Sequence, residues 1–200
     1  GRALQRRQLP TQPAPINTSG QPRLFAVTAG ANANKTIVAY DLAGDAAELV
    51  MAAADNQSIE EVEVGKTNLV VQYLEDVSGK AARLTRDKKG VWKRKEIAAP
   101  ANGTLGLVSG GGGTDDALLS YESLTTPDSL YWLSSKNKLS KIASAPAFYD
   151  ASDVVVEQRF ATSKDGTKVP YYIMAKSGVP AAGNAPAVQY GYGGFLAATL

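Results

Sequence analysis

The chain has 200 residues, of which 44% are hydrophobic, and its 21 basic and 19 acidic side chains give a net charge of +2. This near balance creates no long-range field, so composition indicates neither a nucleic-acid partner nor binding to an anionic membrane surface. Cysteine and histidine are both absent, which excludes a disulfide framework, a thiolate nucleophile and a complete Ser-His-Asp triad within these residues.

The N-terminal segment is polar and basic. It begins at Gly1 without an initiating Met and lacks the apolar core of a signal peptide. We therefore expect a piece cut from a longer protein. No run of about 18 apolar residues occurs in the chain, so the sequence predicts a soluble protein and leaves its compartment open between cytoplasm and periplasm.

Short β-branched or aromatic runs bounded by turn residues fill the chain from about residue 24 to 142, which is typical of antiparallel strands. The first four predicted strands cover residues 24–28, 36–40, 59–64 and 68–73. Residues 45–54 are ambiguous and carry a weak helical period. Residues 82–95 predict a hairpin, because Asp87 and Gly90 stand where a tight turn needs them.

A weak internal repeat indicates the architecture of this region. Residues 70–73 align with residues 118–121, and the same offset of 48 residues aligns 83–85 with 131–133. Strands that repeat at about 40 to 50 residues are typical of β-propeller blades, each of which buries its faces only against its neighbours. A sandwich or another meandering antiparallel sheet remains the alternative.

The character of the sequence changes after residue 142. Residues 143–153 contain Pro146 and small side chains, as a linker does. Strands at 154–162 and 169–175, joined by a turn, form a predicted hairpin in which Pro170 is tolerable near a strand start. A third predicted strand, residues 187–190, follows a loop rich in Gly and Pro.

This third strand leads into Tyr-Gly-Tyr-Gly-Gly-Phe at residues 190–195. Glycines after a strand allow a tight turn with uncovered N–H groups, as an oxyanion-binding loop requires. In α/β-hydrolases the loop after the third strand supplies one oxyanion donor. The Tyr192 phenol stays protonated at neutral pH and can donate a hydrogen bond to an oxyanion. Packing of Tyr192 beside the glycine turn is the alternative.

Two motifs in this order resemble the start of the peptidase domain in the prolyl oligopeptidase family. The first is Arg-Phe-Ala-Thr-Ser-Lys-Asp-Gly-Thr-Lys-Val-Pro-Tyr at residues 159–171, and the second is the motif at 190–195. Close resemblance covers residues 118–200, whereas residues 1–117 fit the family only as propeller-like sequence.

The resemblance implies a mainly β chain in two parts. Residues 1–147 would be the C-terminal blades of a partial β-propeller, and residues 148–200 would be the first strands of an α/β-hydrolase peptidase domain. The parent protein would be a serine peptidase that hydrolyses short peptides on the carboxyl side of proline, and it would need no cofactor and no metal. Its partner would be a proline-containing peptide, and the oligomeric state is not indicated.

The resemblance also implies roles for two residues of the second motif. Tyr192 would be the side-chain member of the oxyanion hole, and Phe195 would line the pocket that receives the substrate proline. The related branch that cuts after basic residues tends to end this motif with Gly-Ser-Tyr, so Gly194 and Phe195 favour the prolyl branch. Core packing is the alternative role for Phe195.

The chain departs from the family because it has no Gly-x-Ser-x-Gly motif and no histidine. We therefore expect it to be inactive alone, with the triad in sequence that follows. The rival interpretation is a propeller-type interaction module without hydrolytic activity. The adjacent carboxylates at Glu60-Glu61 and Asp115-Asp116 are not expected to form a catalytic or metal site, since strand neighbours point to opposite faces and a loop pair lacks further ligands.

Overall fold

The computed structural model describes residues 23–29, 35–41, 46–111, 113–179 and 184–191, and within these ranges the chain forms thirteen β-strands and no helix. Membrane-crossing helices are accordingly not found in the described ranges. Every strand pair is antiparallel.

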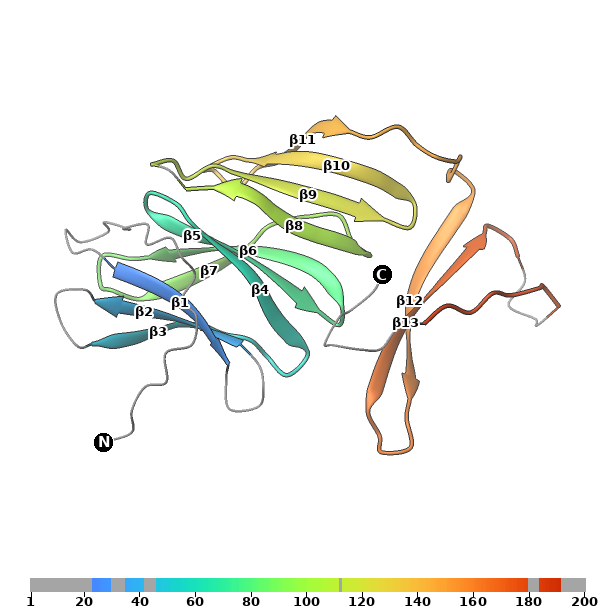
Figure 1. Ribbon diagram of the computed structural model, residues 1–200, viewed down its shortest axis with the longest axis horizontal. Coiled ribbons are helices and arrows are strands. Elements are labelled where there is room, and N and C mark those ends of the chain that lie inside the picture. The colour runs from blue at the N-terminus through green and yellow to red at the C-terminus, as the bar shows by residue number, and fades with distance from the viewer. Residues whose placement is uncertain (1–22, 30–34, 42–45, 112, 180–183, 192–200) are drawn as a thin grey trace.

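The strands form three sheets and a separate hairpin (Figure 1). The first sheet holds β1 (Arg23–Ala29), β2 (Lys35–Asp41) and β3 (Ala47–Ala52). The second sheet holds β4 (Gln57–Val64), β5 (Asn68–Glu75), β6 (Ser78–Arg86) and β7 (Trp92–Glu96). The third sheet holds β8 (Gly103–Gly110), β9 (Ala117–Ser123), β10 (Thr126–Leu133) and β11 (Leu139–Ser144). The terminal hairpin holds β12 (Val154–Thr162) and β13 (Lys168–Lys176).

The second and third sheets are meanders of the same order, β4-β5-β6-β7 and β8-β9-β10-β11. The repeat seen in the sequence joins equivalent strands, because residues 70–73 lie on β5 and residues 118–121 lie on β9, each the second strand of its sheet. Tyr73 and Tyr121, which align in that repeat, are both 2% exposed. The described structure therefore has the succession of small antiparallel sheets expected of propeller blades.

The structure assigns the stretch of this region that the sequence leaves ambiguous. Residues 45–54, which carry a weak helical period, contain β3 instead of a helix. Strand β3 completes the first sheet by pairing with β2, and only Met51 of its side chains is fully buried. Pairing along β2 therefore outweighs a marginal local periodicity.

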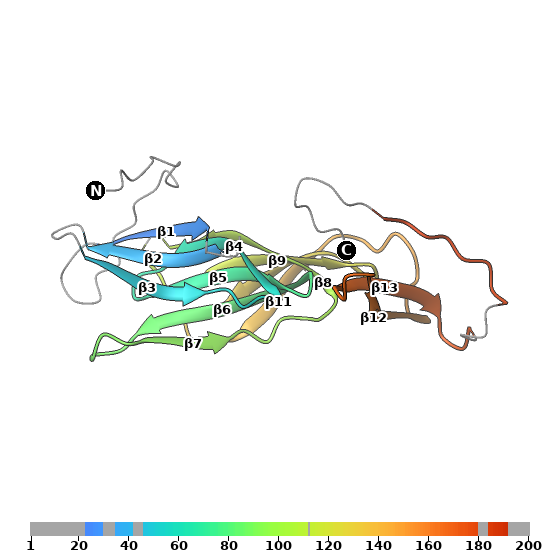
Figure 2. The same ribbon diagram turned by 90° about the horizontal axis from the view of Figure 1, so that it is seen from below.

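Strand β5 in the middle of the second sheet is buried on both faces, and its residues 68–73 are all buried. Leu69, Val71 and Tyr73 face the first sheet in a core that also contains Ile37 and Met51. Val70 of the same strand packs in a second core against the third sheet. Both ribbon views place β1–β3 and the terminal hairpin at opposite ends of the molecule, with the second and third sheets between them (Figures 1 and 2).

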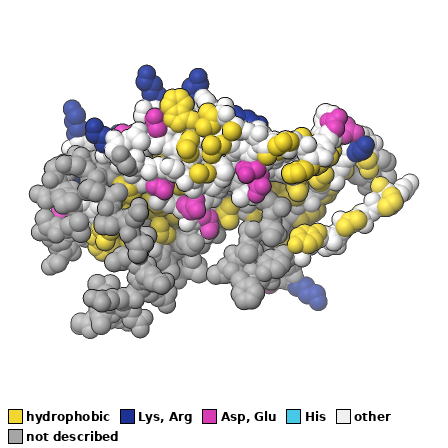
Figure 3. Space-filling view, turned by 45° about the horizontal axis from the view of Figure 1, so that its top comes forward, with side chains coloured by type: hydrophobic (Ala, Val, Ile, Leu, Met, Phe, Trp, Pro, Cys, Tyr) yellow, Lys and Arg dark blue, Asp and Glu magenta, His cyan; other side chains and the backbone are white. Residues whose placement is uncertain are grey.

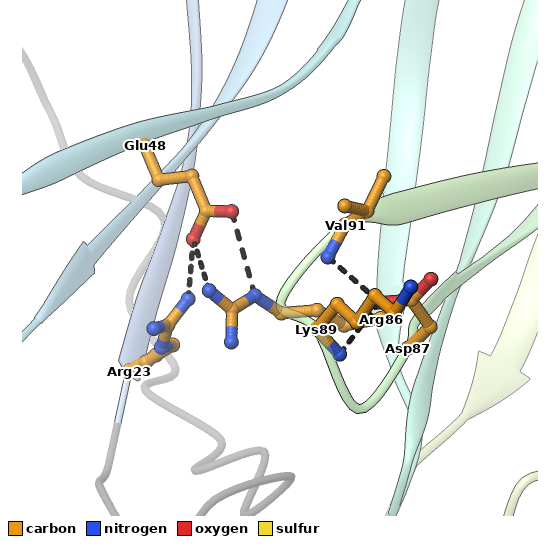
Figure 4. Close-up of polar contacts among 6 residues, drawn as sticks. All are labelled: Arg23, Glu48, Arg86, Asp87, Lys89 and Val91. Carbon is orange, nitrogen blue, oxygen red and sulfur yellow. Dashed lines mark hydrogen bonds and ion pairs between the residues drawn. The ribbon is translucent and has the colours of Figure 1, made fainter.

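The two cores are accompanied by polar contacts between sheets. Glu48 on β3 accepts hydrogen bonds from Arg23 Nη1 at 2.6 Å and from Arg86 Nε at 3.4 Å, so one carboxylate joins the first sheet to β6 of the second. Figure 4 shows both guanidinium groups converging on Glu48 beside the β6–β7 turn. The Asp87 carboxylate organises that turn by accepting the backbone N–H of Lys89 and Val91.

The second and third sheets are joined by a buried guanidinium. Arg83 on β6 is 5% exposed, and its Nη1 donates to Asn68 Oδ1 at 2.7 Å and to the Asp115 carbonyl at 2.6 Å. Its Nε and Nη2 donate to Asn137 Oδ1 at 3.1 Å and to the Ser134 carbonyl at 2.9 Å. Burial lowers the pKa of Arg83, against the opposing effect of the carboxylates that follow β8.

Carboxylates at this junction serve the packing of the sheets. Asp115 accepts the N–H of Thr67 at 2.7 Å and its hydroxyl at 2.6 Å, and Asp116 accepts the N–H of Ser135. Glu61 accepts the N–H of Leu107 across the sheet boundary at 2.8 Å. Three of the four carboxylates in the acidic pairs noted in the sequence thus accept backbone N–H groups from a neighbouring strand or loop.

The backbones of the second and third sheets approach each other closely at Gly79 on β6. A Cβ placed there would lie 2.5 Å from the Leu105 backbone nitrogen and 2.9 Å from the Gly103 carbonyl oxygen. Backbone atoms cannot withdraw as a flexible side chain can, so this position accepts only hydrogen.

Replacing Gly79 with Ala is expected to lower the free energy of unfolding by about 1–3 kcal/mol, because overpacking forces the two sheets apart. Urea denaturation followed by tryptophan fluorescence measures the change. Gly191→Ala is the matched control, since no atom lies within 4 Å of the Cβ that it adds. An equal stability of the two variants would contradict the close approach at Gly79.

Candidate functional site

The two residues predicted to act on substrate, Tyr192 and Phe195, lie outside the described residues. Their predicted roles therefore stay predictions. Three described elements precede them in the chain. These are the linker after β11, the terminal hairpin and residues 184–191.

The predicted third strand is not formed. Residues 187–190 belong to no strand of the structure, and Val188 and Tyr190 are 99% and 83% exposed. A strand buried on both faces needs paired neighbours and apolar cover, and the described residues supply neither at this point. The prediction of a strand that leads directly into the glycines was therefore wrong for this chain.

The predicted hairpin is formed as β12–β13, with nine paired positions from Val154–Lys176 to Thr162–Lys168. The Asp165 carboxylate accepts hydrogen bonds from the Ser163 hydroxyl and the Thr167 N–H, which lower its pKa to about 2. Gly166 adopts φ of 88°, a left-handed conformation that glycine takes without a steric cost. The turn chemistry read from the sequence therefore closes the hairpin.

The two faces of the hairpin differ in burial. On one face Val156, Gln158 and Tyr172 are half-buried, although Phe160 and Met174 nearer its two ends are exposed. On the other face Val155 and Tyr171 are exposed. Hydrophobic side chains of the hairpin and of the segment after it form much of the right-hand end of the molecule (Figure 3). An isolated two-stranded hairpin is at best marginally stable, so this element depends on what it contacts.

The half-buried face contacts the two-residue turn between β5 and β6. Gln158 Nε2 donates to the Asp76 carbonyl at 2.5 Å, and the hydroxyls of Tyr172 and Ser78 lie 2.7 Å apart. Ser78 is 5% exposed. The hairpin is therefore attached to the second sheet by side-chain hydrogen bonds on either side of Val77.

The linker before the hairpin forms a shallow hollow. It is lined by Thr125, by Val154 and by residues 147–152 of the linker, which include Phe148 and Tyr149. The Tyr149 hydroxyl donates to the Leu124 carbonyl, and Phe148 is 95% exposed. Asp150 accepts the N–H of Ser152 within the linker, which lowers the Asp150 pKa. The hollow thus has an exposed aromatic wall, and its carboxylate is engaged by its own loop.

No group of three or more metal-ligating side chains occurs within the described ranges.

The sequence alone did not reveal the roles of two structural residues, Arg83 and Gln158. A single Arg among the small and apolar residues Ala81, Ala82 and Leu84 was the available signal for the first. Nothing local marked the second, because its partner Asp76 is 82 positions away in the chain.

Most of the chain matches a known family model. Residues 14–146 match the model described as prolyl oligopeptidase, N-terminal β-propeller domain. An uncharacterized peptidase of Sinorhizobium fredii is 32% identical over 170 residues, which cover 81% of this chain and 23% of that protein. A prolyl endopeptidase of Elizabethkingia miricola is 34% identical over 110 residues, which cover 54% of this chain and 16% of that protein. The chain thus spans less than a quarter of the length of these two relatives.

Solved structures give the same picture of the fold. A structure from work on two prolyl endopeptidases matches with a TM-score of 0.69 at 27% identity, over 82% of this chain and 24% of that chain. A post-proline cleaving enzyme from Rickettsia typhi matches with a TM-score of 0.59 at 22% identity, over 72% of this chain and 22% of that chain.

Proposed function

Because this chain belongs to the prolyl oligopeptidase family through its N-terminal β-propeller domain, we propose that it is part of a serine peptidase that hydrolyses short peptides on the carboxyl side of proline. The observation that carries the proposal is the family match over residues 14–146 together with the motif Tyr-Gly-Tyr-Gly-Gly-Phe at 190–195. Relatives named as prolyl endopeptidases support the choice of proline.

The proposed division places residues 1–147 in the propeller and residues 148–200 in the peptidase domain. The exposed apolar face of the terminal hairpin supports this division, since side chains such as Val155 and Ile173 would be covered by the peptidase domain that continues from it. In this arrangement the propeller part binds no catalytic group of its own. The terminal hairpin, which precedes the oxyanion-binding motif in the chain, belongs to the peptidase part and contacts the propeller part at the β5–β6 turn.

Tyr192 and Phe195 have distinct proposed roles in the reaction. When a serine attacks the carbonyl that follows proline, negative charge develops on the carbonyl oxygen, and the Tyr192 phenol would donate a hydrogen bond to it. Its proton would stay on the phenol, because the pKa of an ordinary tyrosine is near 10. Phe195 would contact the pyrrolidine ring of the substrate proline as an apolar wall.

The test of specificity compares chromogenic peptides that carry proline or arginine before the scissile bond, with the full-length protein as enzyme. The kcat/KM for proline is expected to exceed that for arginine by roughly 100-fold or more, since an apolar wall leaves a guanidinium group without a partner. Phe195→Ala should reduce this ratio while leaving the arginine peptide unaffected. Faster cleavage after arginine would contradict the proposed preference for proline.

The rival function is a propeller-type interaction module, which the absence of a strand at residues 187–190 favours. The coding sequence beyond Leu200 separates the two. A Gly-x-Ser-x-Gly motif followed by Asp and His is expected for the peptidase, and a reading frame that ends without them would support the interaction module.

A further inference from the structure

The turn between β5 and β6 is strained. Asp76 and Val77 are its two central residues, closed by the pair Glu75–Ser78, and both have positive φ, 48° and 63°. A two-residue hairpin loop of this kind favours Asn-Gly. A β-branched residue such as Val77 is a true outlier there. Such a conformation persists only where its surroundings hold it.

Contacts hold this turn from two directions. On one side, Asn56 before β4 accepts the Asp76 N–H at 3.0 Å and donates from Nδ2 to the Asp76 carboxylate at 3.0 Å. On the other side, the terminal hairpin donates from Gln158 to the Asp76 carbonyl, and Tyr172 bonds Ser78. Val77 is thus enclosed between hydrogen bonds to the residues before and after it.

Both contacts from the hairpin come from a single cross-strand pair of residues. Gln158 and Tyr172 are directly opposite each other in the β12–β13 ladder, so their side chains lie on the same face. One residue pair of the hairpin therefore forms hydrogen bonds on both sides of Val77. Two bonds to neighbouring positions restrict both rotation and translation of the hairpin relative to the turn.

We infer that the Gln158–Tyr172 pair is a positioning device that fixes the terminal hairpin to the Asp76–Val77 turn and thereby sets where the segment carrying Tyr192 begins. The functional half of this inference rests on the proposed peptidase function. The attachment itself does not, and it can be measured in the 200-residue chain.

Hydrogen exchange of the β12–β13 amides measures the attachment, because a detached hairpin would lose its ladder. Tyr172→Phe keeps the ring and removes the hydroxyl, and it is expected to speed exchange in the hairpin by about 2- to 12-fold, the range for one lost hydrogen bond. Tyr171→Phe is the matched control on the exposed face, where exchange should be unchanged. Ser78→Ala combined with Tyr172→Phe should exchange no faster than either single variant. Additive effects would overturn the pairing.

Gln158→Glu makes protection of the hairpin depend on pH, which a contact by packing alone would not do. At neutral pH its carboxylate cannot donate to the Asp76 carbonyl, but its protonated form below the ordinary glutamate pKa of about 4.3 can. Attachment favours the protonated form and so raises the pKa of the introduced carboxyl above this ordinary value. The hairpin's protection should therefore be full below about pH 4.3 and be lost as pH rises through the raised pKa. Wild type, measured at the same low and neutral pH, controls for every other effect of pH on exchange, and Gln158→Leu should lack protection at both. Equal protection of Gln158→Glu at both pH values would overturn the inference. Unchanged protection of the β5 and β6 amides verifies folding of each variant.

In the full-length protein, Tyr172→Phe is expected to lower kcat for a proline peptide by about the same factor by which it speeds hydrogen exchange in the hairpin. The KM should be unchanged, because neither Gln158 nor Tyr172 would contact substrate. Faster exchange without a change in kcat would overturn the positioning role. Should exchange respond while the full-length wild type cleaves no peptide, the peptidase proposal fails and the attachment stands. Unchanged exchange would overturn the attachment whatever the activity.

Discussion

Replacing Tyr192 with Phe in the full-length protein is expected to lower kcat for a proline peptide by about 10²- to 10³-fold, the loss typical of one oxyanion donor. The substitution removes only the phenolic oxygen, so the shape of the glycine-rich loop is kept. The KM should change little, since the hydrogen bond strengthens only when the carbonyl oxygen gains charge.

Tyr190→Phe is the matched control for this experiment. Tyr190 belongs to the same motif and its side chain is 83% exposed, so losing its hydroxyl should leave kcat within about twofold. Equal activity of wild type and Tyr192→Phe would assign Tyr192 to packing beside the glycine turn. It would also remove the one catalytic group proposed for this chain.

Replacing Arg83 with Met is expected to lower the free energy of unfolding by about 3–5 kcal/mol, because it removes the donors of four hydrogen bonds at a buried junction. Met keeps most of the aliphatic stem. The side-chain oxygens of Asn68 and Asn137 and the Asp115 carbonyl then lose the donor that Arg83 supplies, and the Ser134 carbonyl keeps one hydrogen bond, from the Asn137 N–H. Urea denaturation at neutral pH measures the loss.

Lys95→Met is the control for removing a cation from the same sheet. Lys95 lies exposed on β7, so its loss should change the free energy of unfolding by less than about 0.5 kcal/mol. A loss below about 1 kcal/mol for Arg83→Met would mean that the sheets are held by their apolar core alone.

Much of the fold could be read from local pattern. The alternation and bounding residues of β1, β2, β4 and β5 are visible in the sequence, as are the turns at Asp87 and Asp165, whose carboxylates accept the N–H groups two residues on. Side-chain chemistry within a few positions determines such turns, so no distant contact is needed to predict them. Local pattern left residues 45–54 ambiguous and wrongly predicted a strand at 187–190, because pairing partners decide the structure of both segments.

The candidate site divides in the same way. The residue types of the motif at 190–195 indicate an oxyanion-binding loop, and the family match supports the prolyl oligopeptidase assignment from sequence. No local signal could show that Gln158 and Tyr172 attach the hairpin to a strained turn, because the residues involved are 82 and 94 positions apart.

The sequence by itself determined that the chain is built from short antiparallel strands in a repeating order and which family it resembles. Strand period, turn residues and motif spacing are properties of neighbouring positions. Only the tertiary structure decided that Arg83 is buried between two sheets and that Val77 is held in a left-handed conformation. Burial and hydrogen-bond partners depend on which distant segments meet, and in a protein made of stacked sheets these meetings occur at the boundaries between repeats.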